Sequence, residues 1–320
     1  MEFDKSKKIL VIGRAGMDIY PEPPGTKITD VKDFSTHLGG SAANTCVALS
    51  KLGVSSDLVT SISDDAIGEY ILNKLKEFKV GSRFCRRVDK VFQTQLAVVE
   101  TILKNNQSIL YRNNSCDLQL NKDDIDQIYF QDYSAVFISG TALSSEPSRE
   151  AVFYASQKAS KSNIPLIIDL DYRPYNWESD QMKSEIYQKI MSEMDIIIGN
   201  DLEFNIADNS SDGFHLTKNF IEKKPSIIIY KMGEKGSKVF TKEKEFEFGI
   251  FKVDAIKPTG AGDAFNGGFM SSLYKGMSLD ESVKRGSANA ALVVTKVGCS
   301  SAMPDSEELE NFINQQKMEN

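Results

Sequence analysis

The chain has 320 residues, and its 41% hydrophobic content can supply one large α/β core, so a single domain over residues 1–320 is expected. A net charge of −7 at pH 7, without a dense Lys/Arg cluster, argues against nucleic acid or an anionic membrane as a partner. The four cysteines are far apart and only two histidines accompany them, so neither a zinc site nor a disulfide framework is indicated, and the lack of a signal-like or membrane-spanning apolar run predicts a cytoplasmic protein.

Short apolar runs alternate with helical patterns along the chain. The runs predict strands at 9–12, 57–62, 135–139, 165–169, 195–199, 226–230 and 245–256. Apolar residues at helical spacing predict helices at 41–52, 65–78, 147–160, 179–194, 264–275 and 279–296. Such alternation is typical of a mostly parallel sheet that helices cover on both faces.

Two segments, at about 19–38 and 84–112, interrupt this alternation. The second contains strand-like runs at 94–103 and 108–112 on either side of two asparagines, which is typical of a β-hairpin. Together the two segments predict a small antiparallel sheet outside the main one. Such a sheet could act as a lid that excludes water from a pocket, or its exposed face could form a homodimer interface.

The first polar candidates follow the first strand and open the first helix. Arg14 and Asp18 place a cation and a carboxylate near the end of the sheet, where Asp18 could bind two hydroxyl groups. Gly39 and Gly40 permit a close approach at a helix entry, and Asn44 can hydrogen-bond a sugar hydroxyl. The alternative is a tight helix entry in which Asn44 is a capping or solvated residue.

Two guanidinium groups form a second candidate set. Tyr111 and Arg112 end the predicted hairpin, and Arg173 follows the strand predicted at 165–169. These arginines could converge on a carboxylate or phosphate of a ligand. Isolated arginines are more often surface residues, and that reading stays open.

Two later motifs could serve a nucleotide and its metal. Asn200 and Glu203 lie on one face of a helix start and could hold a hydrated magnesium ion, although a helix cap with Glu at its third position has the same pattern. Lys231, Gly233 and Gly236 follow another strand and could line a nucleotide, and the alternative is a simple hairpin turn.

A glycine-rich turn at 257–268 carries the strongest chemical signal. Gly260, Ala261 and Gly262 should expose backbone N–H groups at the positive end of a helix, which attracts an anion. Asp263 lies in the same turn, where it could take a proton from a hydroxyl that attacks a phosphoryl group. The alternative is a helix cap. Neither the P-loop pattern nor the dinucleotide-binding pattern occurs here.

Taken in order, the motifs around Gly39-Gly40, Asn200, Gly233 and Thr259-Gly-Ala-Gly-Asp263 resemble those of the ribokinase-like PfkB carbohydrate kinases. The resemblance implies a three-layer αβα sandwich with a mostly parallel central sheet and a small β-sheet lid. It also implies ATP-dependent phosphorylation of a sugar-like alcohol with Mg²⁺ as cofactor.

By position in that family, Asp263 is the general base and the amides of Gly260, Ala261 and Gly262 form the anion hole. Asn200 and Glu203 become the magnesium motif, acting through water, while Thr259 and Asn289 lie on the nucleotide side.

A narrower set of motifs is similar to the kinases that phosphorylate 5-dehydro-2-deoxygluconate in myo-inositol catabolism. These motifs lie at 13–21, 111–112, 169–173, 257–263 and 299–304. Tyr111, Arg112 and Arg173 also resemble 2-keto-3-deoxygluconate kinases. Both substrates carry a carboxylate, which gives the arginines a purpose. Lys257 departs from the family, many members of which have Asp there to help bind a monovalent cation. Its ammonium is therefore expected to replace that cation, and the alternative is that Lys257 points into solvent.

Two readings from other functional classes remain. A nicotinamide-dependent oxidoreductase shares the α/β alternation but lacks its glycine motif here. A non-catalytic sugar-acid sensor could use the same scaffold.

Overall fold

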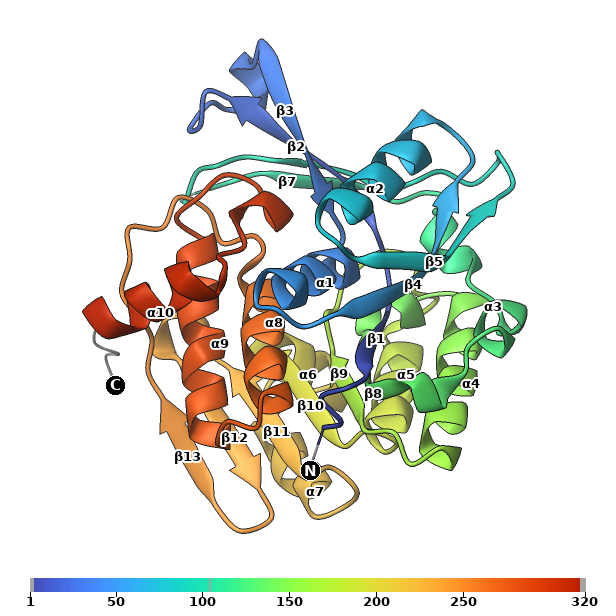
Figure 1. Cartoon of the computed structure of the whole chain (residues 1–320), viewed down its shortest axis with the longest axis vertical. Coiled ribbons are helices and arrows are strands. Elements are labelled where there is room, and N and C mark those ends of the chain that lie inside the picture. The colour runs from blue at the N-terminus through green and yellow to red at the C-terminus, as the bar shows by residue number, and fades with distance from the viewer. Residues whose placement is uncertain (1–2, 104, 317–320) are drawn as a thin grey trace.

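The computed structural model describes residues 3–103 and 105–316 and has a nine-stranded sheet at its centre (Figure 1). The strand order is β13-β12-β11-β10-β9-β8-β1-β4-β5. Only the pairs β11–β12 and β12–β13 are antiparallel, which confirms the predicted, mostly parallel sheet. Its strands are β1 (Lys8–Ile12), β4 (Ser56–Ser63), β5 (Gly81–Val88), β8 (Tyr133–Ser139), β9 (Leu166–Asp169), β10 (Ile196–Asn200), β11 (Ile227–Lys231), β12 (Ser237–Thr241) and β13 (Glu245–Phe248).

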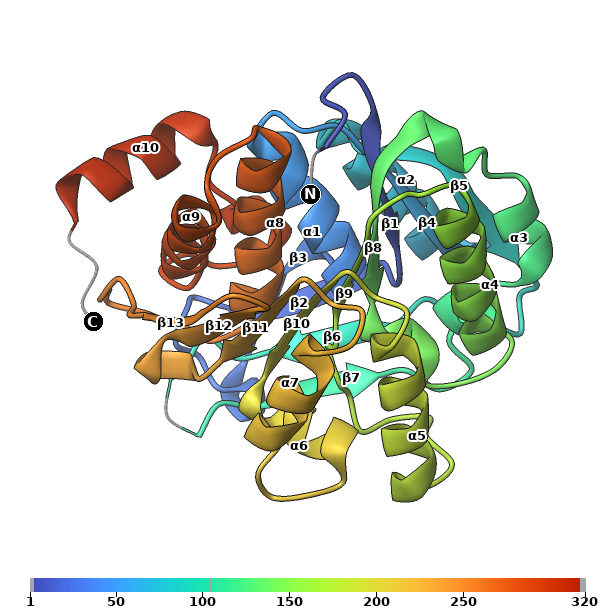
Figure 2. The ribbon, with the colours of Figure 1, turned by 90° about the horizontal axis from the view of Figure 1, so that it is seen from below.

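Helices cover both faces of this sheet and form the three predicted layers (Figure 2). On one side lie α1 (Ser41–Lys51), α2 (Ala66–Glu77), α8 (Ala261–Tyr274) and α9 (Leu279–Val293), with α10 (Ser306–Gln315) packed on α9. On the other lie α3 (Lys122–Asp126), α4 (Ser148–Lys161), α5 (Asp180–Met191), α6 (Asp201–Asp208) and α7 (Phe214–Ile221). No helix in the described ranges is both long and apolar enough to span a membrane.

The apolar runs are continuous because each central strand is buried on both faces. Along β1, Ile9 and Val11 join the core under α1 and α8, whereas Leu10 and Ile12 join the core under α4 and α5. Successive side chains of a strand point to opposite faces, so one short run supplies both cores.

The strand predicted at 245–256 is wrong beyond residue 248. β13 ends at Phe248, and from there the chain leaves the edge of the sheet. Phe251 is then buried with Ala288 of α9, and its ring lies 5.3 Å from that of Phe312. An apolar residue needed by the helical layer therefore extends the sequence pattern past the strand.

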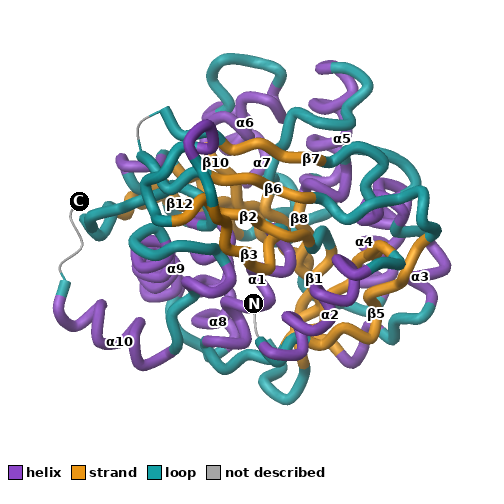
Figure 3. Tube along the Cα trace, turned by 90° about the horizontal axis from the view of Figure 1, so that it is seen from above, coloured by secondary structure: helices purple, strands orange, loops and turns teal. Residues whose placement is uncertain are grey.

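A separate four-stranded sheet, in the order β3-β2-β6-β7, lies across the top of the molecule (Figure 3). It consists of β2 (Gly16–Glu22), β3 (Asp33–Gly39), β6 (Leu96–Val99) and β7 (Ser108–Tyr111), and we call it the lid sheet. β6 and β7 form the predicted hairpin, but β2 and β6 pair in parallel, so the lid sheet is only partly antiparallel.

The start of the second lid segment also needs correction. Residues 84–88 belong to β5, which pairs in parallel with β4 at the edge of the central sheet. Most residues of β5 are partly exposed and three of them are arginines, as expected of a strand at the edge of a sheet. Only the part from β6 onwards crosses into the lid sheet.

Candidate active site

A cavity of about 450 Å³ lies between the lid sheet and the carboxyl ends of the central strands. Lid residues such as Ala97, Val99 and Leu110 form one wall. Twelve of the residues singled out from sequence also line the cavity, namely Arg14, Asp18, Gly40, Asn44, Arg173, Asn200, Glu203, Lys231, Thr259, Gly260, Gly262 and Asp263. Parallel strands that all end at one edge of a sheet bring these distant residues together.

Asp263 lies in the first turn of α8 and faces the amide of Asn44 at the start of α1. The Asn44 Nδ2 donates a hydrogen bond of 2.8 Å to Asp263 Oδ2. Burial raises the pKa of Asp263 to about 7, and the nearby Asp171 carboxylate adds to the rise, whereas the Asn44 bond opposes it. A carboxylate with this pKa can accept a proton near neutral pH and release it again. Asn44 is thus a partner of Asp263 and not a helix cap.

The first turn of α8 presents free N–H groups to the cavity. Gly260 is its N-cap with φ of 87°, and no side chain caps the turn. A Cβ added to Gly262 would lie 3.6 Å from Lys231 Nζ, so the ammonium group and the helix terminus face the same space. Burial opposes the charge of Lys231, but the carboxylates of Asp169 and Glu203 outweigh it and raise its pKa. This arrangement suits a multiply charged anion.

Asn200 and Glu203 form a capping box at the start of α6. Asn200 Oδ1 accepts from the Glu203 N–H at 2.9 Å, and Glu203 Oε2 accepts from the Asn200 N–H at 2.7 Å. Burial, with the neighbouring Asp169 charge, raises the pKa of Glu203 to about 7. The capping alternative is therefore realised, and each oxygen still has a lone pair for a water molecule.

Two residues at this end of the cavity were not among the predicted site residues. Asn266 Nδ2 donates a 2.6 Å hydrogen bond to Asp169 Oδ2, and Lys231 Nζ lies 3.4 Å from the same oxygen. Asp169 Oδ1 and Asn266 Oδ1 are buried and have no partner among the described residues. Asp169 ends β9, so its position at a strand end was the available signal. The Asn266 contact spans 97 residues and has no local signal.

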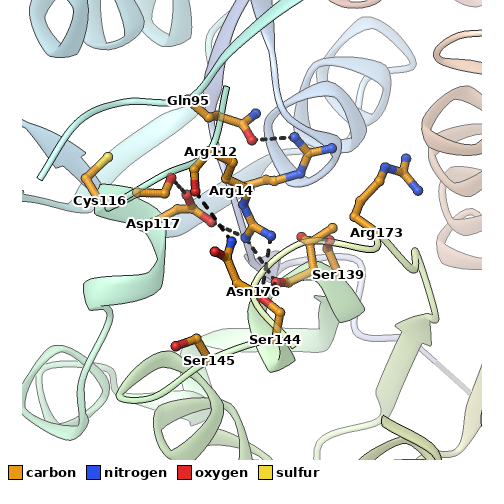
Figure 4. Close-up of polar contacts among 12 residues, drawn as sticks. Arg14, Gln95, Arg112, Cys116, Asp117, Ser139, Ser144, Ser145, Arg173 and Asn176 are labelled. Atoms are coloured by element: carbon orange, nitrogen blue, oxygen red, sulfur yellow. Dashed lines mark hydrogen bonds and ion pairs between the residues drawn. The ribbon is translucent and has the colours of Figure 1, made fainter. Parts of the chain in front are cut away.

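The predicted arginines are placed differently from one another (Figure 4). Arg112 does not line the cavity. Its NH2 forms a 2.6 Å ion pair with Asp117, and both side chains are almost fully buried. Arg173 lines the cavity and is paired with Asp171 at 2.9 Å. Arg14 lines the cavity as well, and its NH1 donates to Gln95 Oε1 at 2.6 Å. The expected convergence of Arg112 and Arg173 on one ligand is therefore not seen.

Lys257 is completely buried beneath the glycine turn, so it does not point into solvent. Its ammonium group donates to the carbonyls of Thr259 at 2.6 Å and Val293 at 3.3 Å. Burial lowers the pKa of Lys257, and the nearby groups Cys299, Asp18 and Asp263 oppose that shift. The cation thus lies directly behind the turn that carries Asp263.

The comparisons with known proteins agree with this geometry. The model of the pfkB family carbohydrate kinases matches residues 6–306. The chain belongs to this family. It is 36% identical to a 5-dehydro-2-deoxygluconokinase of Photobacterium profundum, with 98% of this chain and 96% of the relative covered. A 5-dehydro-2-deoxygluconokinase of Clostridium perfringens is 34% identical over 100% of this chain and 97% of the relative.

Solved structures show the same PfkB fold. An aminoimidazole riboside kinase from Salmonella enterica, complexed with aminoimidazole riboside and an ATP analogue, has a TM-score of 0.82 at 23% identity, covering 96% of this chain and 99% of its own. A neighbour from E. coli that was solved with ATP and Mg²⁺ has a TM-score of 0.86 at 20% identity, covering 97% and 99%.

Several residues of the PfkB pattern lie outside the cavity wall. Gly236 permits a close backbone approach, because a Cβ there would lie 2.0 Å from the Phe248 carbonyl oxygen. Gly233 lies in the β11–β12 hairpin turn, as the hairpin alternative expected. Asn289 is fully buried on α9, and its amide donates to the Ala264 carbonyl oxygen at 2.7 Å.

Three other predicted residues lie beside the cavity without lining it. Tyr111 is 59% exposed on β7. Gly39 leaves room for Asp18, whose oxygen would lie 2.0 Å from an added Cβ. Ala261 is half-buried between the two glycines of the turn.

Proposed function

We propose that the chain is an ATP-dependent kinase that phosphorylates the 6-hydroxyl group of 5-dehydro-2-deoxygluconate. The observation that carries this proposal is the placement of Asp263 beside the uncapped N-terminus of α8, in the wall of a cavity that also contains Lys231. The names of the full-length relatives at 31–36% identity support the choice of substrate.

Direct transfer needs only these residues. The substrate hydroxyl gives its proton to Asp263 while its oxygen bonds to the γ-phosphorus of ATP, and the bond from that phosphorus to the ADP oxygen breaks. The amides of Gly260, Ala261 and Gly262 donate to the transferred oxygens and hold the negative charge. Asp18 and Asn44 would bind sugar hydroxyls.

The residues around Asp169 fit MgATP. Two buried, unpartnered oxygens, Asp169 Oδ1 and Asn266 Oδ1, lie where Lys231 and the α8 terminus meet. Within the described ranges no three His, Cys, Asp or Glu residues are grouped to hold a metal ion directly. We assign Mg²⁺ to Asn200 and Glu203 through water, because both residues line the cavity and their oxygens can accept from a water molecule. When bound, the ion supplies charge neutralisation of the phosphates. Lys231 and Thr259 would contact the nucleotide.

We also propose that Lys257 takes the place of a monovalent cation. Its ammonium donates to two backbone carbonyls immediately behind the anion-binding turn, and carbonyl oxygens are groups that also bind a potassium ion. A tethered cation is always present, so activity should not require potassium.

We propose in addition that the lid sheet forms a homodimer interface. Its outer face exposes Phe34 (46%), Ile109 (38%) and Tyr111 (59%), and burying such a face against a second copy would remove apolar surface from water. Ile109→Lys should then shift the molecular mass measured by light scattering from dimer towards monomer. A wild-type monomer at micromolar concentration would contradict this assembly.

The substrate proposal is tested by coupled ADP-release assays with MgATP. The panel contains 5-dehydro-2-deoxygluconate, 2-keto-3-deoxygluconate, ribose and fructose, and the highest kcat/KM is expected with the first. Preference for another sugar would overturn the substrate. Binding of a sugar acid without ADP release would support a sensor instead of a kinase.

A further inference from the structure

Arg14 is a buried cation without a carboxylate partner. Arg14 and Arg173 line the cavity and Arg112 lies behind its wall, and two of these three guanidinium groups are neutralised, Arg112 by Asp117 and Arg173 by Asp171. Arg14 is 8% exposed, forms no ion pair with any described carboxylate, and leaves its Nε buried without a partner. Burial lowers the pKa of Arg14, and the Asp171 carboxylate, which forms its ion pair with Arg173, opposes this shift from a longer distance. A charge in such a place is costly unless an anion completes it.

Gln95 fixes the position of this cation. Its Oε1 accepts the 2.6 Å bond from Arg14 NH1, as Figure 4 shows, and its backbone carbonyl accepts from the Met17 N–H at 3.2 Å. The side chain lies over Gly16, where a Cβ would come within 2.5 Å of Gln95 Nε2. Gln95 is only 1% exposed.

The orientation of the Gln95 amide follows from the bond to Arg14. The buried Nε2 has no partner among the described residues, yet rotating the amide would place its NH₂ group against a guanidinium N–H. The Gln95 amide thus keeps its oxygen on Arg14, although its Nε2 donors stay unpaired among the described residues. Buried donors that stay unpaired need an explanation, and a functional role of the group that the amide holds supplies one.

We propose that Arg14 binds the carboxylate of the sugar-acid substrate and that Gln95 is the positioning residue that makes the cavity select acids over neutral sugars. This inference rests on the proposed function, because it names the group that recognises the acid. The carboxylate-binding role expected of Arg112 and Arg173 is thus assigned to Arg14 instead. The charges of Arg112 and Arg173 are already paired, whereas Arg14 has no ion pair among the described residues.

The test compares variants on an acid and on its uncharged carboxamide analogue. Arg14→Met removes the cation, Gln95→Met removes the acceptor at similar length, and Gln95→Glu places a carboxylate beside Arg14 as an internal competitor. We expect kcat/KM for the acid to fall about 10-fold with Gln95→Met and about 100-fold with Arg14→Met and Gln95→Glu, through KM. The carboxamide should change less than about threefold. Gln157→Glu, the same charge change on the exposed face of α4, is the matched control.

A binding measurement without ATP separates this inference from the kinase proposal. Calorimetry with D-gluconate and D-glucitol as probes should show that the wild type prefers the acid at least tenfold and that Gln95→Glu loses this preference. Arg14-dependent acid selectivity without turnover of 5-dehydro-2-deoxygluconate would support the inference while overturning the substrate. Equal losses for acid and neutral ligands in the variants, or gluconate binding that Arg14→Met leaves unchanged, would overturn the inference.

Discussion

Asp263→Asn is the most direct test of the chemistry. The amide has the shape of the carboxylate, and its oxygen can still accept the 2.8 Å bond from Asn44, so the cavity should keep its form. What disappears is the proton acceptor. A positioned general base contributes about 10²- to 10⁴-fold, which corresponds to about 2.7–5.4 kcal/mol of the barrier. We expect kcat to fall by that factor, with little change in the binding of either ligand.

The pH profile makes this test specific. With a pKa of about 7, Asp263 is ionised in about one tenth of molecules at pH 6 and about nine tenths at pH 8. Ionisation of Asp263 alone should therefore lower wild-type kcat/KM about tenfold between pH 8 and pH 6. Asp263→Asn should lose this tenfold step, whereas any step from Glu203, whose pKa is also about 7, should remain in both proteins. Coupled ADP release, with the coupling enzymes in excess at each pH, measures the pH profiles of the wild type and of Asp263→Asn. Near-normal turnover in the variant would refute the assignment.

Three further predictions follow from the same geometry. Replacing potassium by sodium should change wild-type activity less than about twofold, because Lys257 supplies the cation, and strong potassium activation would contradict this. Arg112→Ala should lower the free energy of unfolding by about 3–5 kcal/mol, since it leaves Asp117 buried and unpaired, and urea unfolding measures the loss. Gly262→Ala should fold normally, because the atom nearest to the new Cβ, Lys231 Nζ, lies 3.6 Å away, but its methyl group should reduce activity by entering the anion site. Gly260→Ala should also lower the melting temperature, because φ is 87° there and Cys299 Sγ would lie 2.8 Å from the new Cβ.

The fold was predictable where one local signal sufficed. The isoleucine-rich runs of β10 and β11 can be buried only between two helical layers, and the glycine stop after α8 marks its end. Much of the cavity wall followed from the same rule, because polar residues after parallel strands meet at one edge. The PfkB motifs added the roles that patterns alone leave open.

Pairing partners were not predictable from local sequence. Arg112 has the residue type of an anion-binding group, but a short 3₁₀ helix at Cys116–Gln119 turns Asp117 towards it and neutralises its charge. The bond between Arg14 and Gln95 joins positions 81 residues apart. Charge balance in a cavity depends on such tertiary contacts, which a single sequence does not specify.

The cavity places opposing demands on folding and catalysis. Burial raises the pKa of Asp18 to about 6 and those of Glu203 and Asp263 to about 7. An acid whose pKa is higher in the folded state costs no stability below its unfolded pKa, near 3.8 for Asp263, and costs most above pH 7, where it is ionised. The difference between the pKa of 3.8 and the folded-state pKa of about 7 limits the loss of folding free energy to about 4 kcal/mol, and solvent in the cavity reduces that loss. Asp263→Asn should therefore unfold at higher urea concentration than the wild type at pH 8 and lose this advantage at pH 4. A variant that is inactive and also less stable at pH 8 would show that Asp263 holds the fold together, whereas an inactive but more stable one is the result expected of a base kept for chemistry.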